Sequence, residues 1–307
     1  MPSNDAKSAF LFPGQGAQAV GMGAGVCAQL PAARALFDRA SAVLGYDLLH
    51  LCSNGPAERL DSTVCSQPAL FVASMAALEQ LKQNAPELVD RCAAAAGLSL
   101  GEYTALVFAG VMDFETGLRI VQQRGQAMQV AADALAGGML SVLGLSRDEV
   151  ESLCESARDN DTLQVGNLLC PGNIVVSGHK TACARLADLA TEAGAMKVIP
   201  LAVAGAFHTP LMQPAVEWLR AVLADVPLQK PRIPVISNVD ARPHDDPEKI
   251  RELLIQQVCS QVRWEDSMKY LLDDVGITAF YEIGPGRVLA GLLKRIARKV
   301  PCENIAA

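Results

Sequence analysis

The pentapeptide Gly97-Leu-Ser-Leu-Gly101 limits the folds open to this chain more than any other segment. An apolar run, 92–97, leads into it, and a helical stretch over 102–109 follows it. Glycines on both sides of a serine permit a tight strand-to-helix turn that lifts the hydroxyl above a sheet, and the first amide of the helix can then donate to an oxyanion. The pattern indicates an α/β fold with Ser99 as a candidate nucleophile; an ordinary glycine-rich turn is the alternative.

Segments of strand and helix character alternate along the chain, which predicts an α/β fold with a mostly parallel sheet covered on both faces. We expect a large α/β-hydrolase-like domain over 1–136 and 204–307. Residues 137–203 follow the βαββαβ order of a ferredoxin-like unit, which we expect to be a small subdomain inserted into the large domain. The expected strands are 9–12, 92–97, 139–145, 162–168, 173–177, 196–203, 233–237 and 277–283. The expected helices are 31–44, 68–83, 102–109, 113–131, one opening at 146, then 181–193, 210–224, 247–260, 264–274 and 287–299.

Length and composition are those of a globular enzyme. With 307 residues, the chain can hold one large domain and a smaller one. Hydrophobic residues make up 50% and charged residues 19%, which excludes a disordered or fibrous chain. No apolar run approaches the roughly 20 residues needed to span a bilayer, and the polar segment 1–10 has no signal-peptide core. We expect a cytoplasmic monomer that does not enter a membrane.

Cysteine and charge usage exclude several kinds of site and partner. The nine cysteines are an odd number and include no C-x-x-C pair, which argues against a disulfide framework and a zinc ribbon. Histidines and cysteines lack metal-ligand spacing and no nucleotide-binding loop follows a strand, so we expect no metal and no cofactor. The net charge of −7 argues against a nucleic-acid partner, because phosphate binding needs a surplus of Lys and Arg.

A serine nucleophile needs a base at neutral pH, and histidine is the usual one. The chain has four histidines: His50, His179, His208 and His244. His208 lies in the segment 205–212 between an expected strand and an expected helix, where α/β sheets present catalytic groups. The other three lie in polar or helix-end contexts that suit solvated or capping roles. His208 is therefore the candidate base.

Five motifs occur in order along the chain: Phe12-Pro-Gly-Gln-Gly-Ala-Gln18, Gly97-Leu-Ser-Leu-Gly-Glu-Tyr103, Gln123-Arg-Gly125, Ala206-Phe-His-Thr-Pro-Leu-Met212 and Glu282-Ile-Gly-Pro-Gly286. Together they resemble the malonyl-CoA:acyl-carrier-protein transacylases and the related acyltransferase domains of fatty-acid and polyketide synthases. The resemblance covers about 9–299, and that family also carries a ferredoxin-like insertion. It implies transfer of malonyl from malonyl-CoA to the phosphopantetheine thiol of acyl carrier protein, through a serine ester, for fatty-acid synthesis.

The resemblance also implies a role for each matching residue. Ser99 would take the acyl group as an ester, and His208 would deprotonate Ser99 and later the incoming thiol. The backbone N–H groups of Gln15 and Leu100 would form the oxyanion hole, in which one donor is worth roughly 3–4 kcal/mol of transition-state stabilisation. Gln257 would orient the histidine, commonly through its main-chain carbonyl. No Asp or Glu is an obvious third member, so a Ser–His dyad is expected.

Four further positions concern the acyl group. Arg124 would receive the free malonyl carboxylate, because a planar guanidinium binds a carboxylate through two charge-assisted hydrogen bonds. A surface helix position is the alternative for Arg124. Asn167 matches a family asparagine near the site, with a strand-end turn as the alternative, and Phe207 resembles the version associated with unbranched malonyl units. Leu98 is a departure, since the family usually has histidine there; it leaves the dyad intact and bears on the acyl pocket.

Alternative functions share some of these features. An α/β-hydrolase-type thioesterase also uses G-x-S-x-G, but it would need an acid between the serine and a late histidine. A stand-alone acyltransferase serving a polyketide synthase or a malonate decarboxylase would have the same chain. A scaffold that only binds acyl carriers would not need Ser99.

The carrier protein expected as partner is acidic, and this chain is acidic overall, so docking would need a local basic patch. Basic residues cluster in the last expected helix: Arg287, Lys294, Arg295, Arg298 and Lys299. The alternative for this cluster is a solvated helix face, with positive charge favourably near the helix C-terminus.

Overall fold

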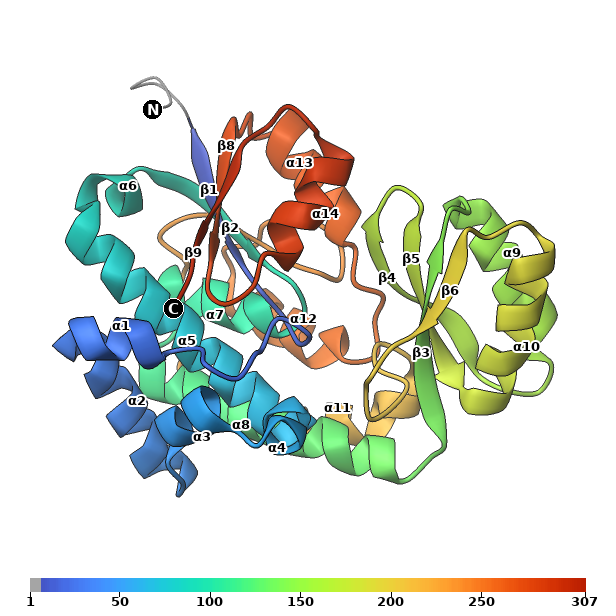
Figure 1. The fold of residues 1–307 in the computed structure, drawn as a ribbon, viewed down its shortest axis with the longest axis horizontal. Helices are drawn as coiled ribbons and strands as arrows, with labels where there is room; N and C mark the ends of the chain where they lie inside the picture. Colours follow the sequence, from blue (N-terminus) through green and yellow to red (C-terminus); the bar gives the residue numbers. More distant parts are fainter. Residues whose placement is uncertain (1–6) are drawn as a thin grey trace.

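The computed structural model describes residues 7–307, and its two β-sheets lie side by side (Figure 1). Segment 1–6, part of the N-terminus in which the sequence predicts no signal peptide, lies outside the described residues. The strands are β1 (Ser8–Phe12), β2 (Cys92–Gly97), β3 (Gly137–Leu143), β4 (Leu163–Cys170), β5 (Asn173–His179), β6 (Lys197–Pro200), β7 (Val235–Ile236), β8 (Ala279–Ile283) and β9 (Cys302–Ile305). The helices are α1 (Ala24–Gln29), α2 (Pro31–Leu44), α3 (Leu48–Asn54), α4 (Ala57–Asp61), α5 (Thr63–Asn84), α6 (Pro86–Asp90), α7 (Leu100–Phe108), α8 (Phe114–Asp133), α9 (Arg147–Arg158), α10 (Lys180–Glu192), η1 (Pro210–Met212), α11 (Gln213–Leu223), α12 (Pro247–Gln257), α13 (Trp264–Asp273) and α14 (Val288–Ile296).

The larger sheet is parallel throughout. Its five strands follow the order β7-β2-β1-β8-β9, which confirms the predicted α/β fold with a mostly parallel sheet. β1 and β2 pair so that Phe12 lies opposite Gly97 at their carboxyl ends. The loops that leave these two strands, at 13–16 and 98–99, therefore begin side by side.

Both faces of this sheet are covered by helices. In β1, Phe10 and Phe12 pack in one buried core together with side chains of α5 and α8. Ala9 and Leu11 point to the opposite face and pack in a second core with side chains of α13 and α14. Because successive strand residues alternate between faces, burial on both sides explains why residues 9–12 of β1 and 92–97 of β2 are uninterrupted apolar runs.

The smaller sheet is an antiparallel ferredoxin-like unit. Its elements follow the chain order β3-α9-β4-β5-α10-β6, and its strands lie in the order β4-β5-β3-β6, as the sequence predicts. In Figure 1 it occupies the green and yellow end of the molecule, with α9 and α10 on its outer side. β6 is shorter than the expected strand over 196–203, because the chain leaves the sheet after Pro200 toward the junction with the large sheet.

Other boundaries also differ from the expectations. The last helix, α14, ends at Ile296 instead of about 299, and Pro301 precedes the unexpected edge strand β9. Proline cannot continue a helix, and the short run Cys-Glu-Asn-Ile has no clear period that predicts a strand. Helix α5 starts at Thr63, ahead of the expected start at Pro68. No helix within residues 7–307 is long and apolar enough to cross a membrane.

Candidate active site

Ser99 lies on a sharp turn between β2 and α7, with φ 51° and ψ −100°. A positive φ is unusual for a residue with a side chain and costs conformational energy. The surrounding contacts must offset this cost. The two flanking glycines make the turn possible. A Cβ on Gly97 would lie 1.9 Å from the carbonyl carbon of Gly101, and a Cβ on Gly101 would lie 2.0 Å from the carbonyl oxygen of Phe12.

His208 lies in the loop that returns from the small sheet to the large domain. The preceding strand, β6, belongs to the antiparallel sheet, as expected for the last strand of the unit over 137–203. Both parts of the molecule hold this loop. The His208 backbone N–H donates to the Val258 carbonyl at 3.0 Å, Gln164 Nε2 donates to the His208 carbonyl at 3.0 Å, and Ser177 Oγ donates to the Phe207 carbonyl at 2.6 Å.

The side chains of these two residues meet. Ser99 Oγ lies 3.0 Å from His208 Nε2, and His208 Nδ1 lies 3.0 Å from the carbonyl oxygen of Gln257. A carbonyl only accepts, so the ring proton belongs on Nδ1, and Nε2 is free to accept the Ser99 proton. Burial, and then the nearby positive charge of Arg124, lower the pKa of His208 to about 4. The imidazole is therefore neutral at pH 7.

Arg124, on α8, is 1% exposed and lies beside the dyad. Its Nη1 donates to Gln67 Oε1 at 2.8 Å, and its Nη2 donates to Ser99 Oγ and to Gln257 Oε1, each at 2.9 Å. Its Nε is buried and has no hydrogen-bond partner among the residues that the structure describes. No carboxylate within residues 7–307 forms an ion pair with it. Because a buried cation without an anion is costly, this position suits an anionic ligand.

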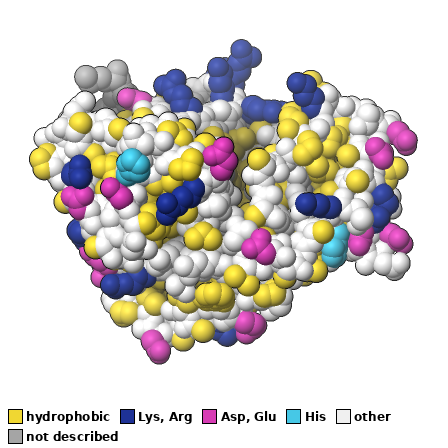
Figure 2. Space-filling model, turned by 60° about the horizontal axis from the view of Figure 1, so that its bottom comes forward, with side chains coloured by type: hydrophobic (Ala, Val, Ile, Leu, Met, Phe, Trp, Pro, Cys, Tyr) yellow, Lys and Arg dark blue, Asp and Glu magenta, His cyan; other side chains and the backbone are white. Residues whose placement is uncertain are grey.

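A cavity of about 90 Å³ connects these groups. Most of the site residues predicted from the sequence line it: Gln15, Ser99, Leu100, Arg124, Asn167, Phe207 and His208. Leu98 also lines it, in the position where the sequence departs from the related family. Gln257 lies behind the cavity wall, where it contacts both His208 and Arg124. Figure 2 shows the surface hollowed between the large and small parts of the molecule, with Lys and Arg side chains along the upper edge of that face.

Polar groups in the cavity wall have unused hydrogen-bonding capacity. Leu100 is the first residue of α7, where backbone N–H groups have no acceptor within the helix. The Gln15 N–H donates no hydrogen bond within residues 7–307. Asn167 Oδ1 is buried and has no hydrogen-bond partner in the described part of the chain. Asn167 lies inside β4, not at a strand-end turn. The described residues include no group of three or more His, Cys, Asp or Glu that could hold a metal ion.

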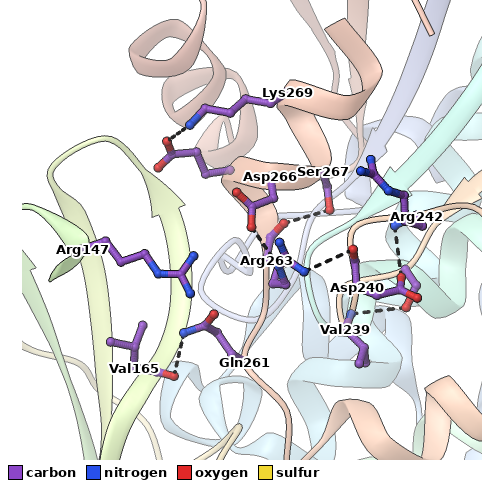
Figure 3. A network of polar contacts seen from close by, with 12 residues as sticks. Arg147, Val165, Val239, Asp240, Arg242, Gln261, Arg263, Asp266, Ser267 and Lys269 are labelled. Carbon is purple, nitrogen blue, oxygen red and sulfur yellow. Dashed lines mark hydrogen bonds and ion pairs between the residues drawn. The ribbon is translucent and has the colours of Figure 1, made fainter. Parts of the chain in front are cut away.

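The segment that follows Gln257 joins the two parts of the molecule. Val262 forms an isolated parallel bridge with Asn167 of β4, and Gln261 Nε2 donates to the Val165 carbonyl at 3.3 Å. Figure 3 shows this junction, in which Arg263 contacts Asp266 of α13 at 2.8 Å. The carbonyl that orients His208 is thus attached to a segment fixed on both sides.

Sequence reasoning missed three residues around the dyad. Asn238 Oδ1 accepts from the Ser99 N–H at 2.6 Å, Gln67 accepts from Arg124, and Glu102 accepts from the side chain of Gln257 at 2.7 Å. Glu102 had a local signal, because it is the only charged residue in the otherwise apolar helix α7. Asn238 and Gln67 lie far from the recognised motifs and had none.

Known proteins are similar to this chain over nearly its whole length. The chain matches the family described as acyl transferase domain over residues 9–306. It is 46% identical over 298 residues to the mitochondrial malonyl-CoA-acyl carrier protein transacylase of Mus musculus, with 94% of this chain and 78% of that protein covered. The solved malonyl CoA-acyl carrier protein transacylase of Coxiella burnetii is 40% identical, with a TM-score of 0.93 and coverage of 98% and 94%. A malonyl-transacylase solved in complex with a type II PKS acyl-carrier protein is 37% identical, with a TM-score of 0.93 and coverage of 97% and 96%.

Proposed function

Since the chain belongs to the acyl transferase family, we propose that it transfers malonyl groups from malonyl-CoA to the phosphopantetheine thiol of acyl carrier protein. One observation carries the proposal. Ser99 Oγ lies within hydrogen-bonding distance of both a neutral imidazole, His208, and a buried cation, Arg124, that forms no ion pair with any carboxylate of residues 7–307. This arrangement suits a serine nucleophile acting on a thioester that carries a free carboxylate.

In the first step, Ser99 Oγ attacks the thioester carbonyl of malonyl-CoA while His208 Nε2 takes the hydroxyl proton. The backbone N–H groups of Gln15 and Leu100 stabilise the negative charge that develops on the carbonyl oxygen. The carbon–sulfur bond then breaks, His208 returns the proton to the CoA sulfur, and malonyl remains as an ester on Ser99.

In the second step the carrier thiol follows the same path in reverse. His208 Nε2 takes the thiol proton, the sulfur attacks the ester carbonyl, and the Ser99 oxygen leaves with the proton from His208. The main-chain carbonyl of Gln257 accepts from Nδ1 throughout, which keeps the required tautomer and stabilises the protonated ring.

Arg124 selects the substrate. Its guanidinium pairs with the malonyl carboxylate, so acetyl-CoA leaves this buried cation unpaired and is disfavoured by about 2–4 kcal/mol. Asn167 is assigned to the acyl group because it lines the cavity and its buried Oδ1 accepts no hydrogen bond from residues 7–307. Phe207 lines the same small cavity and favours unbranched malonyl over bulkier branched units.

We also propose the domain organisation, the oligomeric state and the location. Segments 1–136 and 204–307 form the large domain and 137–203 the small one, since each contributes its own sheet. A monomer suffices, because one chain supplies every group of the mechanism. All nine cysteines are free thiols, which suits a reducing cytoplasm.

Intact-mass analysis after incubation with malonyl-CoA tests the reaction. We expect a mass gain of one malonyl unit, lost in Ser99→Ala, much smaller with acetyl-CoA, and discharged on adding carrier protein that bears phosphopantetheine. Malonyl-pantetheine product identifies a transferase, whereas free malonate as the main product would identify a thioesterase. A wild-type chain that acquires no malonyl at Ser99 would contradict the proposal.

A further inference from the structure

Glu102 is a buried acid that the proposed mechanism does not use, and burial raises its pKa to about 7. It lies three residues after Ser99 on α7, is 4% exposed, and does not line the substrate cavity. Its Oε2 accepts two hydrogen bonds, from Gln257 Nε2 at 2.7 Å and from the backbone N–H of Asn238 at 3.0 Å. Both partners are themselves buried, with 1% exposure each. A buried acid between two such amides is an acceptor whose loss leaves two donors unpaired.

The first contact determines which way the Gln257 side chain faces. Glu102 offers oxygens as acceptors and Arg124 offers only donors, so the amide nitrogen of Gln257 must face Glu102 and its oxygen must face Arg124. The distances agree, because Gln257 Oε1 accepts from Arg124 Nη2 at 2.9 Å. Gln257 Nε2 also donates to the Ser99 carbonyl at 3.1 Å. The main chain of this same residue holds His208 at Nδ1.

The second contact supports the nucleophile. Asn238 Oδ1 accepts from the Ser99 N–H at 2.6 Å, and its Nδ2 donates to the Gly97 carbonyl at 2.8 Å. These two hydrogen bonds stabilise the turn in which Ser99 has a positive φ. Glu102 accepts from the backbone N–H of Asn238 and thereby fixes the position from which the Asn238 side chain forms these two hydrogen bonds.

We propose that Glu102 is a positioning residue: by accepting from both Gln257 and Asn238, it sets the orientation of the substrate-binding guanidinium and of the nucleophile together. The inference rests on the proposed function and extends it to malonyl selectivity. Glu102 does not touch the reacting atoms. It acts through Gln257 and Asn238. Glu102 therefore supports Ser99 and Arg124 through Gln257 and Asn238, and it does not contact His208.

The test compares Glu102→Met, which removes the acceptor and keeps the volume, with Glu102→Gln, whose carbonyl oxygen can still accept both bonds. Single-turnover acylation of Ser99 is measured with malonyl-CoA and with acetyl-CoA. For Glu102→Met we expect acylation by malonyl-CoA to slow by at least about tenfold and the malonyl-to-acetyl rate ratio to fall by about tenfold, since one buried hydrogen bond is worth about that factor. For Glu102→Gln we expect both quantities to stay within about threefold of wild type.

Glu282→Met is the matched control. Glu282 is also a fully buried acid, and it accepts from the backbone N–H groups of Leu289 and Ala290 at 3.0 and 2.9 Å, away from the cavity. Losing that acceptor should lower thermal stability while the malonyl-to-acetyl ratio stays at the wild-type value. The ratio is independent of the folded fraction, so a purely structural role for Glu102 leaves it unchanged.

A second variant keeps the inference testable if Glu102→Met does not fold. Gln257→Met retains the main-chain carbonyl that holds His208 and removes the link between Glu102 and Arg124, so it should lower the same ratio. An unchanged ratio in both foldable variants, or equal damage from Glu102→Gln and Glu102→Met, would overturn the inference. If the wild-type enzyme itself takes up no malonyl, the proposed function fails, and that result is read directly from the wild-type sample.

Discussion

At the scale of single residues, the surroundings of His208 decide that it acts as a base. Burial disfavours the charged imidazole, and the adjacent Arg124 disfavours it further, so the pKa falls from 6.5 to about 4. The carbonyl of Gln257 fixes the proton on Nδ1. The same ring in solvent would be partly protonated near pH 6.5 and a less available base.

Titration of the base should therefore affect the rate of Ser99 acylation below the neutral range. Since the neutral form of His208 is the base and its pKa is lowered, the step in kcat/KM for malonyl-CoA that reports this base should have its midpoint near pH 4. Burial raises the pKa of Glu102 to about 7, so a separate step near that pH belongs to Glu102. Stopped-flow acylation between pH 3.5 and 8 measures this profile, with circular dichroism at each pH to verify folding. A midpoint near 6.5 that persists in Glu102→Gln would show that His208 is not held neutral by its surroundings.

Arg124 carries the substrate preference in a single side chain. Arg124→Ala should lower kcat/KM for malonyl-CoA by roughly 30- to 1000-fold, because the carboxylate loses its partner and the transition state loses about 2–4 kcal/mol of stabilisation. Acetyl-CoA should lose far less, so the preference should disappear. Arg124→Lys keeps the positive charge but cannot form two parallel hydrogen bonds to a carboxylate, so its kcat/KM for malonyl-CoA should lie between those of the wild type and Arg124→Ala. Equal losses for both acyl groups would mean that Arg124 does not read the carboxylate.

At the scale of elements, the junction of β2 and α7 depends on close backbone packing. β1 and β2 are paired at Phe12 and Gly97, and α7 starts directly above them. Glycine at 97 and 101 allows the turn to approach the neighbouring backbone. The strand-to-helix geometry thus limits the side chains that the motif tolerates.

Gly101→Ala should distort this junction. Its Cβ would lie 2.0 Å from the Phe12 carbonyl oxygen, a backbone atom that cannot move aside freely. We expect a loss of at least about 2 kcal/mol in the free energy of unfolding, together with slower acylation of the displaced Ser99. Gly291→Ala on α14, where a Cβ meets nothing within 4 Å, is the control and should stabilise by about 0.5–1 kcal/mol. Urea unfolding of both variants measures the difference, and equal stabilities would contradict the packing argument.

At the scale of the whole molecule, the site forms where the two sheets meet. Ser99 comes from the large sheet, and Asn167 comes from the small one. His208 lies on the connection between them, with hydrogen bonds to both parts. Figure 1 shows α14 on the same side of the large sheet as α13, next to the β4–β5 hairpin. The basic residues of α14 therefore border the junction.

The structure refines the prediction of a carrier-binding patch on α14. Arg295 Nη2 donates to the Pro171 carbonyl at 3.0 Å, so reversing its charge would also break a link to the small sheet. Lys294 lies on α14 and Lys299 lies beyond its end at Ile296; both are exposed and give a cleaner test. Lys294→Glu with Lys299→Glu should lower kcat/KM for the carrier protein by about tenfold at low salt, and less at high salt, while acylation by malonyl-CoA stays unchanged. Arg119→Glu, at an exposed position on α8, is the control; an unaffected transfer rate in the double variant would reject the patch.

Local rules account for what was predictable. Strand and helix periods, read with the glycines around Ser99, were enough to predict the parallel sheet and the βαββαβ unit, since the order of strands and helices along the chain is a local pattern. The motifs also marked Ser99, His208 and Arg124, which the structure brings together around one cavity. The strand β9 escaped prediction because four residues of mixed polarity carry no period.

Contacts across the fold decided the rest. That Asn238 holds the Ser99 amide, that Gln67 holds Arg124, and that Glu102 lies behind Gln257 depends on residues 57 to 155 positions apart in sequence. No local pattern records such pairings, because their hydrogen bonds form only after both sheets and their helices have packed. The nucleophile and the base could therefore be predicted from the sequence. The hydrogen bonds that hold them in place could not, because only tertiary packing determines which buried donors meet which acceptors.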